Sequence, residues 1–191
     1  MEEPITTSPT TQYIIDRVRL IRHELGLSQR EVSRFLSPDT DSNILGNIES
    51  IRTNNGYSDH NLGILAHSFT DYARKLLREM DKGAIANSHI KEEYTVFDFY
   101  PEKPLSDILQ IKTKVELPEG ISLTGTLNLI LETKDFLNHP RTIREITEYC
   151  NSFHDKNWKS NNITSTLEFF VKKSKLKKFE DNDGGVKYQK S

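Results

Sequence analysis

The N-terminal part of the chain alternates apolar and polar positions with the period of an α-helix. Apolar side chains recur every three or four residues from Ile14 to Leu25, which predicts a helix with one apolar face. Gly26 follows at once, and glycine accepts the left-handed conformation in which many helices end. The pattern therefore predicts a first helix that stops at Gly26.

Two further short helices are predicted after Gly26. Ser28 to Glu31 has the S-x-x-E spacing of a capping box, which favours a second helix starting at once. Ser37-Pro38-Asp39 interrupts the pattern, because proline lacks the N–H that a helix interior needs. A third helix is expected after a cap at Asp41 or Ser42. Its inward-facing side chains are expected to be Ile44, Leu45 and Ile48.

A helix, a short turn and a second helix form the arrangement that places the second helix in the DNA major groove. The stretch resembles the helix-turn-helix of the phage repressor and Cro group, often called the Xre family, over roughly residues 10–70. The resemblance is carried by the sequence L-G-L-S-Q of residues 25–29, by Ile48-Glu49 and by Arg22. Two features depart from the family: a longer turn at 37–40, and Gly46 within the expected recognition helix, which costs up to ~1 kcal/mol of helix propensity.

The resemblance implies roles for several residues. Gln29, at the start of the second helix, is expected to contact a DNA phosphate. Arg22 and Glu49 are expected to form a mostly buried pair that joins the first helix to the recognition helix. The loop after the third helix is expected to run beside the DNA backbone, with Arg52 as its phosphate contact.

Candidate base contacts lie on the expected recognition helix. Asparagine can form two hydrogen bonds with adenine in the major groove, and serine can bind several bases. The candidates are Ser42, Asn43, Ile44 and Asn47, with Arg30 of the second helix as a further DNA contact. The alternative interpretation is a set of ordinary exposed polar residues and a solvated arginine face.

A long apolar stripe follows, from Leu62 to Met80, at alternating steps of three and four residues. It predicts one helix of about six turns, or two helices with a break at Ser68 to Thr70, as in the resembled family. The first half is expected to close a small core. The second half, Phe69 to Met80, is expected either to complete that core or to form a dimer contact.

Residues 83–125 carry shorter patterns and are interpreted as a partly structured linker. Tyr94 to Tyr100 alternates enough for a short strand or a packed segment. Pro104 is well placed to start a short helix through Leu105, Ile108 and Ile111. Leu117 to Gly120 is expected to form a turn.

The last segment, residues 126–191, predicts three helices and a hairpin. Residues 127–137 have a helical pattern, Thr142 to Glu145 is a second capping box, and Ser160 or Asn161 can cap a third helix. Two alternating runs flank a D-G-G turn, which is typical of a hairpin. This order resembles a winged helix. Its candidate DNA contacts are Asn161, Asn162 and Lys177. Clustered lysines attract phosphates, or else protect the end of a helix and an edge strand, and winged helices also bind proteins.

Composition limits the classes of protein. The net charge is −2, with residues 91–125 acidic and residues 126–191 mildly basic, so any nucleic-acid contact depends on local charge. A single cysteine excludes an intrachain disulfide and fits a reducing compartment. No apolar run approaches the ~20 residues of a membrane span, and the polar N-terminus does not resemble a signal peptide. We therefore expect a soluble, cytoplasmic protein.

The sequence contains little that indicates catalysis. Cys150 and His154 have helical i, i+4 spacing, but two ligands without a third do not make a metal site. Glycine-rich phosphate loops and serine elbows do not occur in the sequence. An enzyme, a cofactor and a metal are therefore not expected.

These patterns together predict a mainly α protein. Residues 1–10 are expected to be a disordered tail, 11–82 a helix-turn-helix bundle of four to five helices, 83–125 a linker, and 126–191 a small α+β winged-helix-like domain. The expected function is sequence-specific binding of double-stranded DNA by a transcription regulator, acting as a homodimer. The alternative is a protein-interaction module, an antitoxin or adaptor whose winged helix binds a protein partner.

Overall fold

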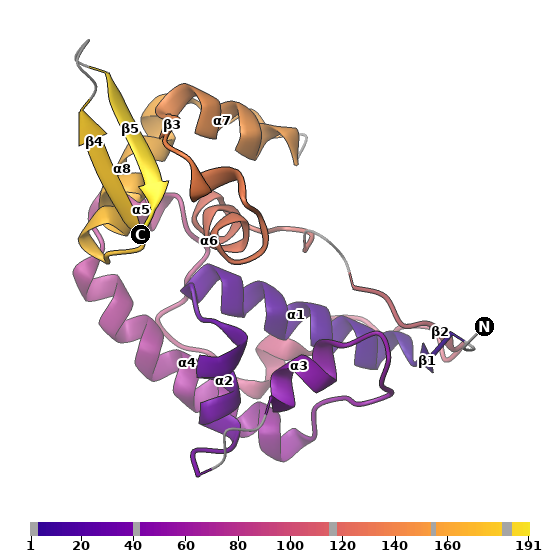
Figure 1. Cartoon of the computed structure of the whole chain (residues 1–191). Helices are drawn as coiled ribbons and strands as arrows, with labels where there is room; N and C mark the ends of the chain where they lie inside the picture. Colours follow the sequence, from indigo (N-terminus) through magenta and orange to yellow (C-terminus); the bar gives the residue numbers. More distant parts are fainter. Residues whose placement is uncertain (1–3, 40–42, 115–117, 154–155, 181–184) are drawn as a thin grey trace.

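The computed structural model describes residues 4–39, 43–114, 118–153, 156–180 and 185–191. Within them the chain is mainly helical, with eight α-helices and five short strands, as the sequence predicts (Figure 1). The strands form a two-stranded sheet, β1-β2, and a three-stranded sheet in the order β3-β5-β4. No helix in the described ranges has both the length and the apolar character needed to cross a bilayer.

The first helix, α1 (Pro9–Leu25), begins earlier than the sequence predicts. Ser8 caps it, since its hydroxyl accepts a hydrogen bond from the N–H of Thr11 at 3.1 Å. Gly26 ends it with φ of 66°, as predicted. Before α1, strand β1 (Thr6–Thr7) pairs antiparallel with β2 (Gln110–Ile111). The prediction of a disordered tail is therefore wrong for residues 6–10, because a distant segment supplies the hydrogen-bond partner.

Helices α2 (Gln29–Leu36) and α3 (Ile44–Glu49) follow as predicted. The capping box of Ser28 and Glu31 is formed in both directions. The hydroxyl of Ser33 on α2 accepts from the N–H of Leu45 at 3.1 Å and so joins the two helices. Asp41 and Ser42, the predicted caps of α3, lie outside the described residues, and Asn43 is the cap observed.

Helix α4 (Asp59–Glu79) is one unbroken helix of 21 residues. The break considered at Ser68 to Thr70 does not form, because the Thr70 hydroxyl bonds elsewhere. It donates to the carbonyl of Tyr94 at 3.1 Å and accepts from the N–H of Tyr94 at 2.8 Å. The rings of Tyr94 and Phe99 pack edge-on against Phe69, with centroids 6.2 and 6.1 Å away. The chain itself thus buries the apolar stripe of α4, which corrects its assignment as a dimer contact.

The segment predicted as a linker packs into the core. It contains α5 (Lys82–Ala86), the 3₁₀ turn η1 (Val96–Phe99) and β2. Tyr94 is 5% exposed and Phe99 is fully buried. The predicted strand at 94–100 is a 3₁₀ turn, because Asp98 accepts hydrogen bonds from the N–H and hydroxyl of Thr95. The predicted helix at 105–111 does not form, and Ile111 pairs in β2 instead.

The C-terminal segment has the predicted order of helices and hairpin, but its first helix spans Leu123–Thr133 and not residues 127–137. Its elements are α6 (Leu123–Thr133), η2 (Phe136–Asn138), β3 (Arg141–Thr142), α7 (Ile143–Ser152), α8 (Ser160–Lys172), β4 (Leu176–Glu180) and β5 (Val186–Lys190). The capping box of Thr142 and Glu145 starts α7 as predicted. The hairpin pairs Lys178 with Tyr188, whereas the D-G-G turn lies outside the described residues. The short strand β3, which pairs with β5, is not predicted by the sequence.

Helix α6 occupies the middle of the molecule, between α1 and the C-terminal helices and strands (Figure 1). Its residues 123–131 are all buried. The carboxylate of Glu24 on α1 joins the two helices, because it accepts from the N–H and the hydroxyl of Ser122 at 2.6 and 2.5 Å. A Cβ at Gly125 would lie 2.7 Å from Glu24, so glycine permits this close approach. Buried residues from Ile14 to Tyr188 form one continuous hydrophobic core.

Candidate nucleic-acid interface

The C-terminal end of α3 is anchored by a buried ion pair. Arg22 Nε lies 3.3 Å from Glu49 Oε1, and the two side chains are 2% and 1% exposed. The second oxygen of Glu49 accepts a hydrogen bond from Gln29 Nε2 at 2.6 Å. The structure therefore contains the predicted contact of α1 with α3, and adds α2 to it.

This anchor changes the assignment of Gln29. The sequence assigned its side chain to a DNA phosphate, but the amide nitrogen donates to Glu49. A buried carboxylate needs hydrogen-bond donors at both oxygens, and the guanidinium of Arg22 donates to only one oxygen of Glu49. Gln29 is half-buried and positions α3 rather than facing outward.

The exposed side of α3 carries two asparagines. Asn43 is the N-cap, and its side-chain oxygen accepts from the N–H of Gly46 at 2.9 Å. A Cβ at Gly46 would lie 2.2 Å from the Asn43 amide, so the glycine makes room for this cap. Asn47 is exposed, whereas Ile44 is half-buried. The Asn43 side chain is therefore partly engaged in capping. Ser42 lies outside the described residues.

Two arginines flank α3. Arg30 is exposed on α2, and Arg52 is exposed in the turn that follows α3. Arg52 belongs to a loop that Lys112 holds from inside. The buried Nζ of Lys112 donates to the carbonyls of Ile48, Thr53 and Asn55 at 2.7, 2.9 and 3.0 Å. All three ammonium protons are used, and burial lowers the pKa of Lys112.

Arg22 has a second carboxylate partner on α6. Its Nη1 donates to Glu132 Oε2 at 2.7 Å and to the carbonyl of Leu27 at 2.9 Å. The neighbouring His23 is buried, with Nδ1 3.3 Å from the same oxygen of Glu132. Burial, with the charge of Arg22, lowers the pKa of His23 to about 2. The imidazole is therefore neutral, with Nε2 accepting from Arg22 and its proton on Nδ1 facing Glu132.

Sequence reasoning misses Lys112, Glu132 and His23. Lys112 is one lysine in a segment interpreted as a linker, and nothing near it in sequence predicts three carbonyl partners. Glu132 lies 110 positions from Arg22, so only the tertiary fold brings the two together. His23 follows Arg22 directly in the sequence and belongs to no recognisable motif. None of the three gives a signal that a single sequence reveals.

The C-terminal candidates divide differently from the prediction. Asn161, Asn162 and Lys177 are all exposed, but Asn162 also takes part in local hydrogen bonds. The N-cap of α8 is Lys159 and not Ser160 or Asn161 as predicted, and the Asn162 side chain accepts from the N–H of Lys159 at 3.2 Å. Its carbonyl accepts from Asn87, beside α5, at 2.5 Å. The start of α8 thus packs against α5. Asn162 takes part in this packing, because α5 is part of the folded core and not of a free linker.

Possible metal ligands do not cluster in the described ranges. Cys150 is fully buried, and burial raises the pKa of its thiol to about 12. His154, its possible partner, lies outside the described residues. The buried neutral thiol behaves as a core side chain.

Comparison of the chain with protein-family models, with curated proteins and with solved structures finds no match.

Proposed function

We propose that this protein binds double-stranded DNA in a sequence-specific manner, as an Xre-type helix-turn-helix regulator of transcription. One observation carries the proposal. The buried Arg22–Glu49 pair and Gln29 fix one side of α3, while Asn43 and Asn47 are exposed on the other. A helix that is fixed from inside and polar outside is suited to enter a major groove.

Each exposed residue around α3 has a separate part in the proposal. Asn47 reads a base edge, and asparagine prefers adenine because its amide can both donate and accept. Arg30 and Arg52 contact phosphates on either side and set the position of α3. The net charge of −2 means that affinity depends on these local cations, so salt weakens binding steeply.

The C-terminal segment supports a second DNA contact. The element order α6, α7, α8, β4, β5 resembles that of a winged helix, and β3 pairs with β5 in the same sheet. Asn161 at the start of α8 and Lys177 on β4 are exposed and contact the phosphate backbone in this proposal. The protein acts as a homodimer through a surface other than the stripe of α4, since that stripe is buried.

The test begins with selection of a preferred duplex from a random library by the full-length protein. Fluorescence anisotropy then measures affinity for the selected duplex and a scrambled one across a salt series. We expect binding to the selected duplex to be at least ~10³-fold tighter, with a negative salt slope on both. Selection that enriches no sequence, together with salt-independent binding or no binding, would overturn the proposal.

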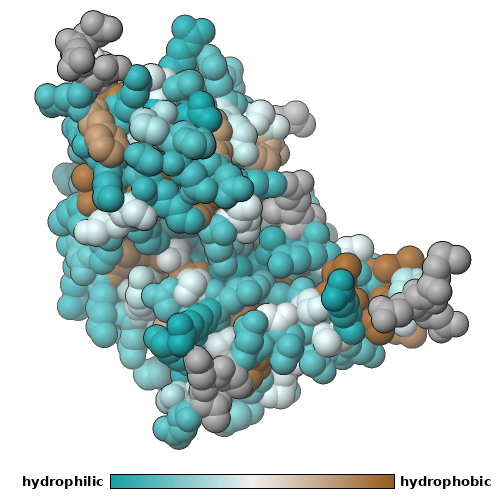
Figure 2. Space-filling view, in the orientation of Figure 1, coloured by the Kyte–Doolittle hydropathy of each residue, from teal (hydrophilic) through white to brown (hydrophobic). Residues whose placement is uncertain are grey.

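The alternative function is a protein-interaction module. The observation that favours it is a group of exposed apolar side chains in strand β2 and the segment that precedes it, visible as brown surface (Figure 2). The group comprises Leu105, Ile108, Leu109 and Ile111, which are 40%, 79%, 63% and 58% exposed. Contiguous exposed apolar surface is typical of protein contacts. Absence of DNA binding in the salt series would favour this alternative.

A further inference from the structure

A pocket of about 310 Å³ lies between residues 23–31 of the N-terminal half of the chain and residues 128–132, 174–175 and 190–191 of the C-terminal half. The end of α1 and the start of α2 form one wall, and the residues around the start of β4 and the end of β5 form the opposite wall. Residues of α6 form the remaining side. This volume is at the small end of ligand pockets, which span roughly 300–1,000 Å³. The size suits a molecule of few non-hydrogen atoms.

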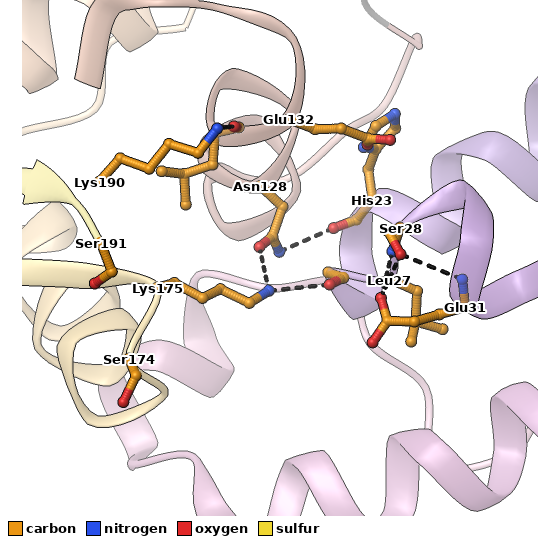
Figure 3. Close-up of a pocket in the computed structure, with 12 residues that line it drawn as sticks. His23, Leu27, Ser28, Glu31, Asn128, Glu132, Ser174, Lys175, Lys190 and Ser191 are labelled. Carbon is orange, nitrogen blue, oxygen red and sulfur yellow. Dashed lines mark hydrogen bonds and ion pairs between the residues drawn. The ribbon is translucent and has the colours of Figure 1, made fainter. Parts of the chain in front are cut away.

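The pocket is lined by two cations and two anions. Lys175 and Lys190 reach it from the strand side, while Glu31 and Glu132 lie on the helix side (Figure 3). The fifth titratable side chain in the lining, His23, is neutral because burial lowers its pKa to about 2. The lining side chains therefore carry no net charge. The two positive charges lie on the strand side of the pocket and the two negative charges lie on the helix side.

The two lysines keep hydrogen-bonding capacity for a ligand. Lys175 Nζ donates to the carbonyl of Gly26 at 3.0 Å and to Asn128 Oδ1 at 2.9 Å. Lys190 Nζ donates to the carbonyl of Leu131 at 2.7 Å. An ammonium has three protons, so within the described part of the chain Lys175 retains one donor and Lys190 retains two.

The two carboxylates also keep capacity. Glu31 uses Oε2 for the N–H and hydroxyl of Ser28, both at 2.7 Å. Glu132 uses Oε2 for Arg22 and faces His23 with the same atom. Among the described residues, the Oε1 atom of each carboxylate accepts no hydrogen bond. Each carboxylate can therefore accept from a ligand without losing its present partner.

This arrangement selects the charge type of the ligand. A simple anion that meets the lysines also meets two carboxylates, and a simple cation meets two ammonium groups. A small molecule with one charge of each sign satisfies both walls, with its carboxylate toward the lysines and its ammonium toward the glutamates. Leu27 and Leu131 supply an apolar surface for a side chain between the charged ends.

We propose that this pocket is a binding site for a small zwitterion of the free α-amino-acid class, held between the ammonium groups of Lys175 and Lys190 and the carboxylates of Glu31 and Glu132. The proposal does not depend on DNA binding. Burial lowers the pKa of Lys175 to about 8, so a ligand carboxylate beside it favours the charged form. Binding near pH 8 should accordingly take up a fraction of a proton.

The test uses the full-length protein and the twenty common amino acids, each up to about 10 mM, with thermal unfolding and then calorimetry as readouts. We expect at least one free amino acid to raise the melting temperature and to give a binding heat. Its N-acetyl derivative, which lacks the ammonium, and its methyl ester, which lacks the carboxylate, should each bind at least ~10-fold more weakly.

Variants locate the binding. Lys190→Met and Glu132→Gln should each weaken binding at least ~10-fold. Lys82→Met on α5 and Glu148→Gln on α7 make the same chemical changes at exposed positions outside the pocket lining and should bind as the wild type does. Circular dichroism checks that each variant is folded. Glu132 also binds Arg22, so if Glu132→Gln loses structure, the result for Lys190→Met decides the test. The proposal is overturned if no amino acid binds, if the N-acetyl derivative binds as well as the free form, or if Lys190→Met binds normally.

Discussion

Replacement of Arg22 by methionine should cost more stability than removal of either of its carboxylate partners. Methionine keeps most of the apolar stem but removes the charge. The carboxylate of Glu49, 1% exposed, then keeps only Gln29 as a donor among the described residues. Removing one partner of a buried pair costs ~3–5 kcal/mol, because the other charge is stranded. Arg22 also binds the carbonyl of Leu27 and Glu132, so the upper end of that range is expected.

Glu49→Gln provides the matched comparison. In this variant the guanidinium of Arg22 keeps Glu132 at 2.7 Å and the carbonyl of Leu27 at 2.9 Å. No charge is stranded, so the expected loss is ~1–3 kcal/mol. The double variant Arg22→Met with Glu49→Gln should lose less than the sum of the two single losses, by ~0.5–3 kcal/mol, because the two side chains are in contact.

The assay is urea unfolding followed by far-ultraviolet circular dichroism, with the free energy of unfolding extrapolated to water. The control is Arg144→Met on α7, which removes an exposed arginine 2.8 Å from Glu148 and should leave the urea midpoint unchanged. If Arg22→Met unfolds at the midpoint of this control, or if the two single losses add in the double variant, the account of the α3 anchor is refuted.

Three further predictions concern the surface of α3, the buried histidine and the loop after α3. Asn47→Ala should cost ~1–3 kcal/mol on the selected duplex and little on a scrambled one, whereas Arg52→Ala should weaken both and reduce the salt slope by about one. His23 has a pKa lowered to about 2 from 6.5, so the unfolded chain binds the extra proton between these values and stability falls as the pH drops below ~6.5. At about pH 5 this costs ~2 kcal/mol relative to about pH 7.5, and urea midpoints of His23→Gln should lack that part of the pH dependence. Lys112→Met should cost ~1–3 kcal/mol and increase amide exchange at residues 50–56, while Lys114→Met at an exposed position should change neither.

Local sequence signals predicted several of the helix boundaries. Ser28 with Glu31 and Thr142 with Glu145 form the two capping boxes where the sequence places them. Gly26 ends α1 with a positive φ. In each case the interacting residues lie within four positions of one another, so a short stretch of sequence contains both partners of the interaction that defines the boundary.

The errors occur where a distant residue decides the local structure. Thr70 could have capped a new helix, but its hydroxyl binds Tyr94, which is 24 positions away, and α4 continues. Lys112 looked like an ordinary linker residue, but its buried ammonium donates to one carbonyl of α3 and to two carbonyls of the loop that follows α3. The same reason applies to the candidate site. The contact of Arg22 with Glu49 followed from the family resemblance, whereas the contact of Arg22 with Glu132 depends on how α6 packs against α1.

Arg22 links α3 to α6 in the middle of the molecule, because it contacts a carboxylate of each helix. One guanidinium serves Glu49, at the end of α3, and Glu132, at the end of α6. Glu132 is 31% exposed and lines the pocket between the two halves, whereas Glu49 is closed off from solvent. A positive group that binds Oε1 of Glu132 therefore shares this carboxylate with Arg22, whose Nη1 keeps Oε2, and weakens the attraction between Arg22 and Glu132 without replacing it. The route from this pocket to α3 is then the single guanidinium of Arg22, which contacts both glutamates.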